Sequence, residues 1–241
     1  NKMKIEIIKC LQDNFSYLII DEINSIACVV DPSEAKPIIN FVDNNNLNLK
    51  YILNTHHHFD HIGGNMMLKK RYNSKVIGFK GDKHRIPEID FLVDDQEVWK
   101  EDNFEAKIYH IPGHTSGHIA FHFFKEKKIF TGDTLFSLGC GRIFEGTYEQ
   151  MYNSLKRIKL LPKETEIYCG HEYTLQNSNF CITYDSGNLK LKNKISKIKE
   201  KLKNGLPTVP TILGDEIQCN IFLKAEDLQT FSKLRDLKDN F

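Results

Sequence analysis

The sequence THHHFDH, residues 55–61, gathers imidazole and carboxylate side chains into one short stretch. It follows the apolar run 51–53, so it lies where a predicted strand ends and a loop begins. Side chains two apart in an extended segment point the same way, so His56 and His58 converge, and the turn after them brings Asp60 and His61 alongside. Zn²⁺, Fe²⁺ and Mn²⁺ all accept such ligands. Four donors supply half of two coordination shells, so the stretch predicts a site for two ions rather than one.

Three further candidate ligands share one placement in the sequence. Each lies just beyond a strand-like run and beside a glycine: His114 in Pro-Gly-His, Asp133 in Thr-Gly-Asp and His171 in Cys-Gly-His. Glycine lets the backbone turn sharply around a compact centre, and sites gather at strand ends on one edge of a sheet. We therefore expect all seven side chains to meet. His84, in a polar loop, and His110 and His122, inside strand runs, are best explained as structural residues. For His118 a structural role is also favoured, and a hydrogen bond to a metal ligand is the alternative.

Composition limits the classes of function that the chain can have. The 241 residues carry a net charge of +1 and no apolar stretch long enough to span a bilayer, so we expect a soluble protein without stable membrane association. A near-neutral charge also disfavours nucleic acid as a partner. Six scattered cysteines indicate neither a disulfide framework nor a zinc finger, which favours the cytoplasm. The chain begins before Met3, as trimming would leave it, so an organellar form stays open.

The pattern of apolar runs predicts a mixed α/β fold. Strands are expected at residues 5–8, 17–20, 26–30, 51–53, 76–79, 107–111, 119–124, 128–130 and 167–169. Helices are expected at 34–43 (after an Asp-Pro-Ser start signal), 64–72 and 149–160. Such a mixture suits two sheets packed face to face with helices outside.

After residue 173 we expect strands to cease and helices to follow at 189–203 and 226–238. This change predicts a catalytic domain at 1–173 and a small helical domain at 174–241. The first of these helices carries many lysines around one apolar stripe, which is typical of a solvated face. Contact with an anionic membrane is the less favoured interpretation.

The motifs THHHFDH, PGHTSGH, TGDTLF and CGHEYT resemble those of the metallo-β-lactamase superfamily, and within it those of the glyoxalase II (hydroxyacylglutathione hydrolase) family. The resemblance extends over nearly the whole chain and implies an αββα sandwich with an added C-terminal helical domain. It implies that His56, His58 and His114 bind one metal ion and that Asp60, His61 and His171 bind a second. Asp133 and a hydroxide would bridge the two ions, and these seven residues would be catalytic through that hydroxide. Zn²⁺ is the expected metal, with Fe²⁺ or Mn²⁺ as alternatives.

The implied reaction is the hydrolysis of S-D-lactoylglutathione to D-lactate and glutathione, a step in methylglyoxal detoxification. The implied glutathione contacts are Arg142, Phe144, Tyr173, Arg235 and Lys238. Phe144 stands where some members of the family have tyrosine, which removes one hydroxyl contact worth about 1 kcal/mol. We expect a monomer or weak homodimer.

Other functions stay open on the sequence alone. A mononuclear-iron persulfide dioxygenase would not need the full second metal site or this helical tail. A lactonase or β-lactamase would have no use for the cations that would bind glutathione. A nuclease is disfavoured by the near-neutral charge. A Ser or Cys nucleophile is disfavoured because the best-placed histidines are already used as metal ligands. A noncatalytic metal-binding protein would have a closed coordination shell.

Overall fold

The computed structural model describes residues 3–241 and divides into two compact units. The first contains the chain up to His110 together with Gly117–Glu126, and the second contains Ile111–Ser116 and Lys127–Phe241. This division follows compactness, and the domain boundary near residue 173 stays a prediction.

The first unit contains a six-stranded sheet whose spatial order follows the chain. Its strands are β1 (Met3–Cys10), β2 (Asn14–Asp21), β3 (Ile26–Val30), β4 (Asn48–Leu53), β5 (Lys75–Phe79) and β6 (Phe91–Val93). The first three pair antiparallel, and β3 to β6 pair parallel. Parallel neighbours need a crossover between them, and helices supply it after β3 and after β4.

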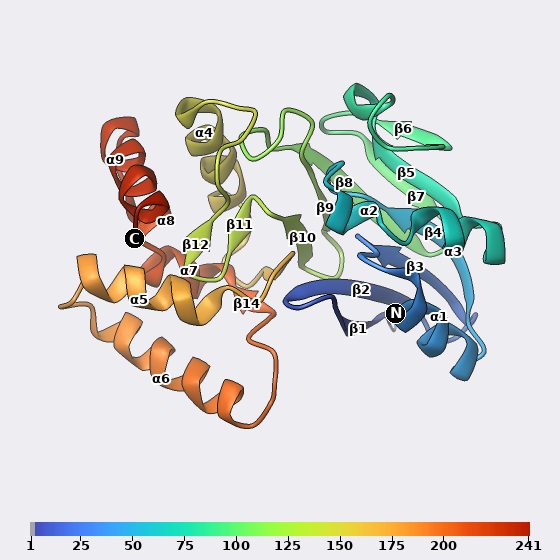
Figure 1. Ribbon diagram of the computed structural model, residues 1–241, viewed down its shortest axis with the longest axis horizontal. Coiled ribbons are helices and arrows are strands. Elements are labelled where there is room, and N and C mark those ends of the chain that lie inside the picture. Colours follow the sequence, from blue (N-terminus) through green and yellow to red (C-terminus); the bar gives the residue numbers. More distant parts are fainter. Residues whose placement is uncertain (1–2) are drawn as a thin grey trace. The chain divides into compact units, whose positions relative to one another are not determined.

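Those crossovers include α1 (Ala35–Asn44) and α3 (Asn65–Tyr72), and the short α2 (Phe59–Ile62) precedes α3. A 3₁₀ turn, η1 (Lys80–Asp82), follows β5. Ile38, Val42 and Leu68 of the long helices are buried in one cluster with side chains of β2 to β5. One face of the sheet is therefore covered by helices (Figure 1).

A second set of strands in this unit consists of β7 (Val98–Glu101), β8 (Phe104–His110) and β9 (Ile119–Phe123), paired antiparallel. Tyr51 of β4 packs its ring edge against Trp99 of β7, with centroids 5.2 Å apart, and also contacts Phe104 of β8. Helices, one sheet and then these strands thus form three successive layers, in agreement with the predicted packing of two sheets. The end of β4, which carries the histidine stretch, lies at the edge of this core.

The second unit contains short strands and most of the helices (Figure 1). Its strands are β10 (Lys128–Gly132), β11 (Leu135–Phe136), β12 (Gly139–Cys140), β13 (Glu166–Cys169) and β14 (Thr211–Ile212). Its helices are α4 (Tyr148–Lys159), α5 (Thr174–Tyr184), α6 (Leu189–Lys203), α7 (Leu213–Cys219), α8 (Ile221–Lys224) and α9 (Leu228–Asp239). β13 lies between β10 and β14, β11 and β12 form a small hairpin, and α9 packs against α4 and α8.

Side-chain caps explain where α4, α6 and α9 begin. Thr147 accepts a hydrogen bond from the main-chain N–H of Gln150, whose side chain in turn accepts from Thr147 N, so a complete capping box starts α4. The side chain of Asn188 caps α6, and that of Asp227 caps α9. The predicted helix at 189–203 has the bounds expected, and α4 and α9 differ from prediction by one or two residues at either end.

The expectation that strands cease after residue 173 is wrong. β14 pairs antiparallel with β13, joining Glu166 to Ile212. Two residues after a proline are too short to show an alternating pattern, so the sequence carries no signal for this strand.

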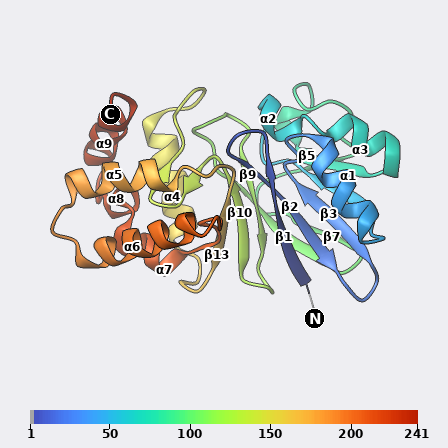
Figure 2. The ribbon, with the colours of Figure 1, turned by 60° about the horizontal axis from the view of Figure 1, so that its bottom comes forward.

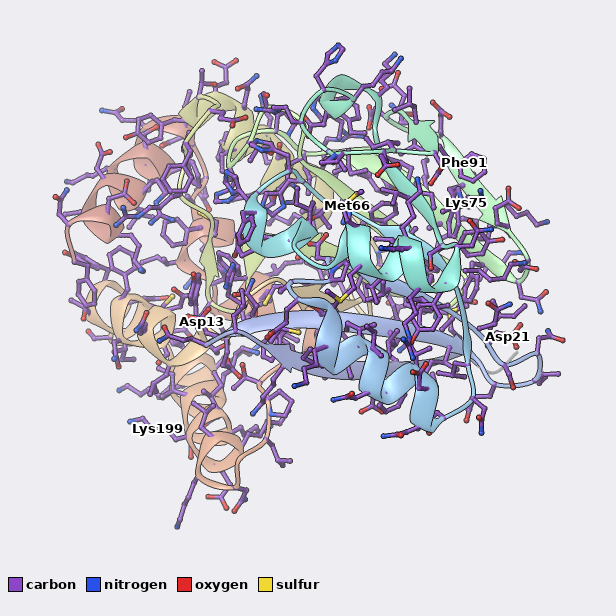
Figure 3. All side chains as sticks on the ribbon, turned by 45° about the vertical axis from the view of Figure 1, so that its right-hand side comes forward. Asp13, Asp21, Met66, Lys75, Phe91 and Lys199 are labelled. Carbon is purple, nitrogen blue, oxygen red and sulfur yellow. The ribbon has the colours of Figure 1, made fainter. Side chains whose placement is uncertain are left out.

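The lysine-rich α6 has the one-sided burial that its sequence predicts. Leu191 and Ile198 are buried, whereas Lys199 is exposed and labelled on α6 in Figure 3. α5 runs beside α6 in both ribbon views (Figure 2). Within residues 3–241 there is no helix with both the length and the apolar character needed to cross a bilayer.

Candidate active site

The first unit brings together four of the predicted metal ligands at the end of β4. The ring centroid of His56 lies 4.9 Å from that of His58 and 4.2 Å from that of His61. His61 Nε2 lies 3.4 Å from the carboxylate of Asp60. The convergence of His56 and His58 follows from their alternation in an extended segment, and α2 then turns Asp60 and His61 toward them.

A buried carboxylate that the sequence analysis did not single out fixes two of these histidines. Asp31 Oδ2 accepts hydrogen bonds from the hydroxyl of Thr55 (2.6 Å) and from Nδ1 of His61 (2.9 Å). Because the Thr55 hydroxyl gives its proton to Asp31, it must accept from Nδ1 of His56, 2.8 Å away. Both imidazoles therefore carry their proton on Nδ1 and present the lone pair of Nε2, as metal ligation requires.

Hydrogen bonds from Asn14 orient the carboxylate of Asp60. Asn14, at the start of β2, donates its side-chain N–H to Asp60 Oδ2 at 3.0 Å and to the Asp60 carbonyl at 3.1 Å. His118, expected to be structural, is buried and stacks on the ring of His56 with centroids 4.4 Å apart. It supports the His56 ring by packing.

The other histidines expected to be structural lie elsewhere in the first unit. His110 stacks on Phe79, with centroids 4.5 Å apart. Burial, with a smaller effect from the nearby Lys107, lowers the pKa of His122 to about 4. A histidine that stays neutral in this way behaves as a core residue.

The second unit brings together the remaining three predicted ligands. Asp133, just beyond β10, places Oδ2 at 3.1 Å from Nε2 of His171 and 3.5 Å from Nε2 of His114. His114 donates from Nδ1 to the carbonyl of Arg142 at 2.7 Å, so its Nε2 also presents a lone pair. His171 follows β13, which pairs parallel with β10, so neighbouring strand ends carry Asp133 and His171 to the same edge.

Gly141 allows the backbone to pass unusually close to this group. A Cβ atom at this position would collide with the main-chain oxygen of Asp133 and lie 3.2 Å from Nδ1 of His114. Gly141 N donates to the Thr134 carbonyl at 3.1 Å, which holds the two segments together. Only glycine fits such an approach.

A cavity of about 340 Å³ in the second unit adjoins these ligands, a volume suited to a small molecule. Every predicted glutathione contact lines it. Its walls are formed by His114, Asp133, Phe136, Cys140, Gly141, Arg142, Phe144, Tyr173, Gln176, Asn177, Arg235 and Lys238.

The cationic and aromatic residues of this cavity differ in how they are held. Tyr173 lies flat on the ring of His171 with centroids 4.6 Å apart, and Phe144 meets the ring of His114 edge-on at 5.3 Å. Arg142 is largely exposed, whereas Arg235 is 3% exposed. Burial, with the charges of Arg235 and Arg142, lowers the pKa of Lys238.

The comparisons with known proteins cover the whole of this architecture. A family model for the metallo-β-lactamase superfamily matches residues 13–171, and one for the hydroxyacylglutathione hydrolase C-terminus matches residues 172–241. A hydroxyacylglutathione hydrolase of Pelagibacter ubique is 65% identical over 99% of this chain and 100% of its own length. One from Prochlorococcus marinus strain MIT 9301 is 47% identical over 96% of this chain and 94% of its own.

The chain belongs to the hydroxyacylglutathione hydrolase family. The resemblance found in the motifs is thus confirmed, and the alternative dioxygenase and lactonase functions are not favoured.

Solved structures agree on the fold. The chain superposes on ETHE1 from Myxococcus xanthus with a TM-score of 0.74 at 23% identity, covering 98% of this chain and 90% of that one. For the B3 metallo-β-lactamase BLEG-1 the TM-score is 0.73 at 21% identity, over 92% and 100% of the chains. The predicted metallo-β-lactamase fold with a C-terminal helical region is confirmed. The superfamily and the clustered imidazoles and carboxylates indicate that the chain binds divalent metal.

Sequence reasoning missed the residues that orient the ligands. It used Asp31 only as part of a helix start signal, yet Glu34 is the residue preceding α1 and Asp31 bonds to Thr55 and His61 instead. Asp31 does share one signal with the predicted ligands, since it also comes directly after an apolar strand. That placement could have marked it as a site residue.

Proposed function

We propose that this chain hydrolyses S-D-lactoylglutathione, and related S-acylglutathiones, to D-lactate and glutathione with two divalent metal ions. Similarity to hydroxyacylglutathione hydrolases over 99% of the chain supports this reaction. The assignment of a glutathione thioester as substrate rests on a cavity in the second unit that is lined by cationic side chains and adjoins three of the predicted metal ligands. Such a hydrolase would act in methylglyoxal detoxification.

The proposed metal ligands divide as the family resemblance implies. His56, His58 and His114 would hold one ion, Asp60, His61 and His171 the other, and Asp133 would bridge them. Mixed nitrogen and oxygen donors fit Zn²⁺, with Fe²⁺ and Mn²⁺ as alternatives. When bound, two such ions lower the pKa of water and polarise a thioester carbonyl.

The residues of the chain have defined tasks in this scheme. Asp31 and Thr55 hold the imidazoles of His61 and His56 in the tautomer that ligation needs, and the Arg142 carbonyl does the same for His114. These hydrogen bonds hold the imidazoles in the orientation that ligation needs, so little reorganisation would accompany ion binding. The imidazoles are thereby preorganised to hold the metal ions, whose positive charge would stabilise the negative charge that develops during hydrolysis.

A cysteine nucleophile is not required and is poorly supported. Cys140 lines the cavity, but burial raises the pKa of its thiol. Burial also raises the pKa of Cys169 to about 12. The thiolate is the reactive form, so neither side chain is prepared to attack a thioester.

Glutathione carries two carboxylates, and the cavity offers positive charge to receive them. The exposed guanidinium of Arg142 and the ammonium of Lys238 are suited to such contacts, and Tyr173 offers a hydroxyl. Phe144 supplies an aromatic surface without a hydroxyl.

We propose a cytoplasmic enzyme acting as a monomer or weak homodimer on a small molecule, with no nucleic-acid partner or stable membrane association. Within residues 3–241 the six cysteines form no disulfide, which fits a reducing compartment.

A paired substitution in the histidine stretch tests the function. His58→Ala is expected to lose metal and nearly all hydrolysis of S-D-lactoylglutathione, whereas its neighbour His57, outside the proposed ligand set, serves as the matched His57→Ala control. Turnover is measured on the glutathione thioester beside a lactone and a glutathione persulfide. Faster turnover of either competitor, or full activity and metal content in His58→Ala, would reject the proposal.

A further inference from the structure

The second unit contains another cavity, of about 570 Å³, lined by α6 on one side and by β14 and α7 on the other. α6 packs against α7, and the two helices lie side by side in Figure 2. The volume is in the range of sites that bind small molecules. The lining residues all lie between 190 and 219 and include none of the predicted metal ligands or glutathione contacts, so this cavity is separate from the candidate active site.

Lysines from α6 form one wall of this cavity. Their spacing of three or four residues places them on a single face of the helix, over a length of about 16 Å. We call this set the lysine stripe, and it consists of Lys190, Lys194, Lys197 and Lys201. Within residues 3–241, Asp215 is the only carboxylate that lines the cavity. Positive charge is therefore concentrated here, in a chain whose net charge is only +1.

The four lysines differ in how they are held. Lys194 Nζ donates to the hydroxyl of Thr211 at 2.8 Å and lies 3.3 Å from Glu216 Oε2, and its side chain is only 16% exposed. The other three lysines are exposed, and within residues 3–241 no hydrogen bond or ion pair engages their side chains. Lys194 thus belongs to the floor of the cavity, whereas the other three ammonium groups are available to a ligand.

The stripe is better suited to a row of anionic groups than to one compact anion. Lys197 and Lys201 are four residues apart, and like charges at this spacing repel each other and destabilise a helix. A bound anion would remove this repulsion. A compact anion reaches only one or two ammonium groups along such a length, whereas linked phosphates reach several, and lysine binds phosphate as a point charge.

The part of the lining formed by β14 and α7 has a different chemistry. Pro210, Ile212 and Cys219 supply apolar surface, and the amide of Gln218 can both donate and accept hydrogen bonds. Such a surface suits a planar ring with polar edges. The cavity is also concave, so a flat bilayer would meet the outer lysines and leave this lining unused. A small molecule fits the whole cavity better.

We propose that this cavity binds a small organic polyphosphate of the nucleoside triphosphate class. Its phosphates would lie along Lys190, Lys197 and Lys201, and its ring would lie against Pro210 and Ile212. The ligand is held without covalent chemistry. This inference goes beyond the proposed hydrolysis and does not depend on it, because the cavity shares no lining residue with the candidate active site.

Calorimetric titration of the full-length, metal-loaded protein with ATP tests the proposal. Every titration is made at the same ionic strength, because salt screens exposed charges. We expect ATP to bind more tightly than inorganic triphosphate, which lacks the ring, and sulfate at equal ionic strength to compete poorly with ATP.

Two double variants of α6 locate the binding. Lys197→Gln with Lys201→Gln removes two lysines of the stripe and should weaken ATP binding by about 10-fold. Lys199→Gln with Lys203→Gln is the matched control, with the same spacing and change of charge at exposed positions that do not line the cavity (Figure 3 labels Lys199). The control should keep the affinity of the wild type. Circular dichroism checks that both variants are folded.

The matched pair also removes a competing explanation. Both variants leave the predicted metal ligands and the cationic cavity beside them unchanged, so ATP bound there would give the same signal in each. No binding of ATP by the wild type, or an equal loss in the two variants, would overturn the proposal. Inorganic triphosphate binding as tightly as ATP would rule out the contact with the ring. Binding to phosphatidylserine vesicles without binding of ATP would show a diffuse basic surface and would also overturn it.

Discussion

Asp31 joins two histidines of the first unit through one carboxylate. It is 2% exposed, and its Oδ2 accepts from both Thr55 and His61. Oδ1 accepts from Thr55 N at 2.8 Å, so in Asp31→Asn the amide N–H would face either this main-chain N–H or the two donors to Oδ2. We expect metal affinity to fall by about 10- to 100-fold, as for other residues that orient metal-bound histidines, measured by metal analysis after dialysis against a weak chelator.

Asp21 provides the control for that substitution. It is also a buried carboxylate of the first unit, labelled in Figure 3, but its hydrogen bonds come from Asn24 and Asn103. Asp21→Asn should keep its metal. Equal metal retention by the two variants would contradict the role of Asp31.

If Lys238 binds the substrate as proposed, we expect substrate binding to be sensitive to alkaline pH. Burial and the charges of Arg235 and Arg142 lower its pKa, so it loses its proton at a lower pH than an ordinary lysine, whose pKa is about 10.4. The protonated form binds a carboxylate, so kcat/KM for the glutathione thioester should fall as pH rises through this lowered pKa. In Lys238→Met the value should already be low at neutral pH and this alkaline decline should be absent. An identical decline in the variant would exclude Lys238.

Among the elements, the β11–β12 hairpin depends on α7. Glu216 of α7 is fully buried and accepts hydrogen bonds from Leu138 N (2.7 Å), the Thr211 hydroxyl (2.6 Å) and Asn220 Nδ2 (3.1 Å). Lys194 Nζ of α6 lies 3.3 Å from Glu216 Oε2, the oxygen that also accepts from Thr211. The helical segment thereby holds the hairpin whose last residue, Cys140, adjoins the cavity.

Glu216→Ala removes the acceptor for several buried donors at once. We expect the free energy of unfolding to fall by about 3 kcal/mol, measured by urea denaturation. Its neighbour on the same helix, Asp215, is exposed, and Asp215→Ala should change stability by no more than about 0.5 kcal/mol. A similar small change in both variants would show that the buried network contributes little.

Elements with a strong apolar period could be predicted from the sequence, and those without one could not. The predicted strand at 26–30 and helix at 189–203 have the observed bounds. α5 was missed because its buried face includes Thr174, Asn177 and Ser178, so the helix shows no apolar stripe. β11, β12 and β14 each have two residues, too few for any periodicity.

Across the whole molecule, the sequence was most informative about histidine and aspartate, because few residue types can bind a metal ion. The candidate ligand histidines and aspartates could be selected because their spacing and strand-end placement are unusual, and their role stays a prediction. Family membership is confirmed. Asp31, Asn14 and Glu216 were missed because a single buried polar residue has no pattern around it. Their partners lie up to 79 residues away in the chain, and only the folded structure brings them together.

In the proposed function, hydrolysis needs two ions bound by seven side chains. Metal-free protein titrated with Zn²⁺, with bound metal and hydrolysis of S-D-lactoylglutathione measured at each step, tests it most directly. We predict that full activity is reached only at two ions per chain. Full activity at one ion per chain would contradict the need for a second ion.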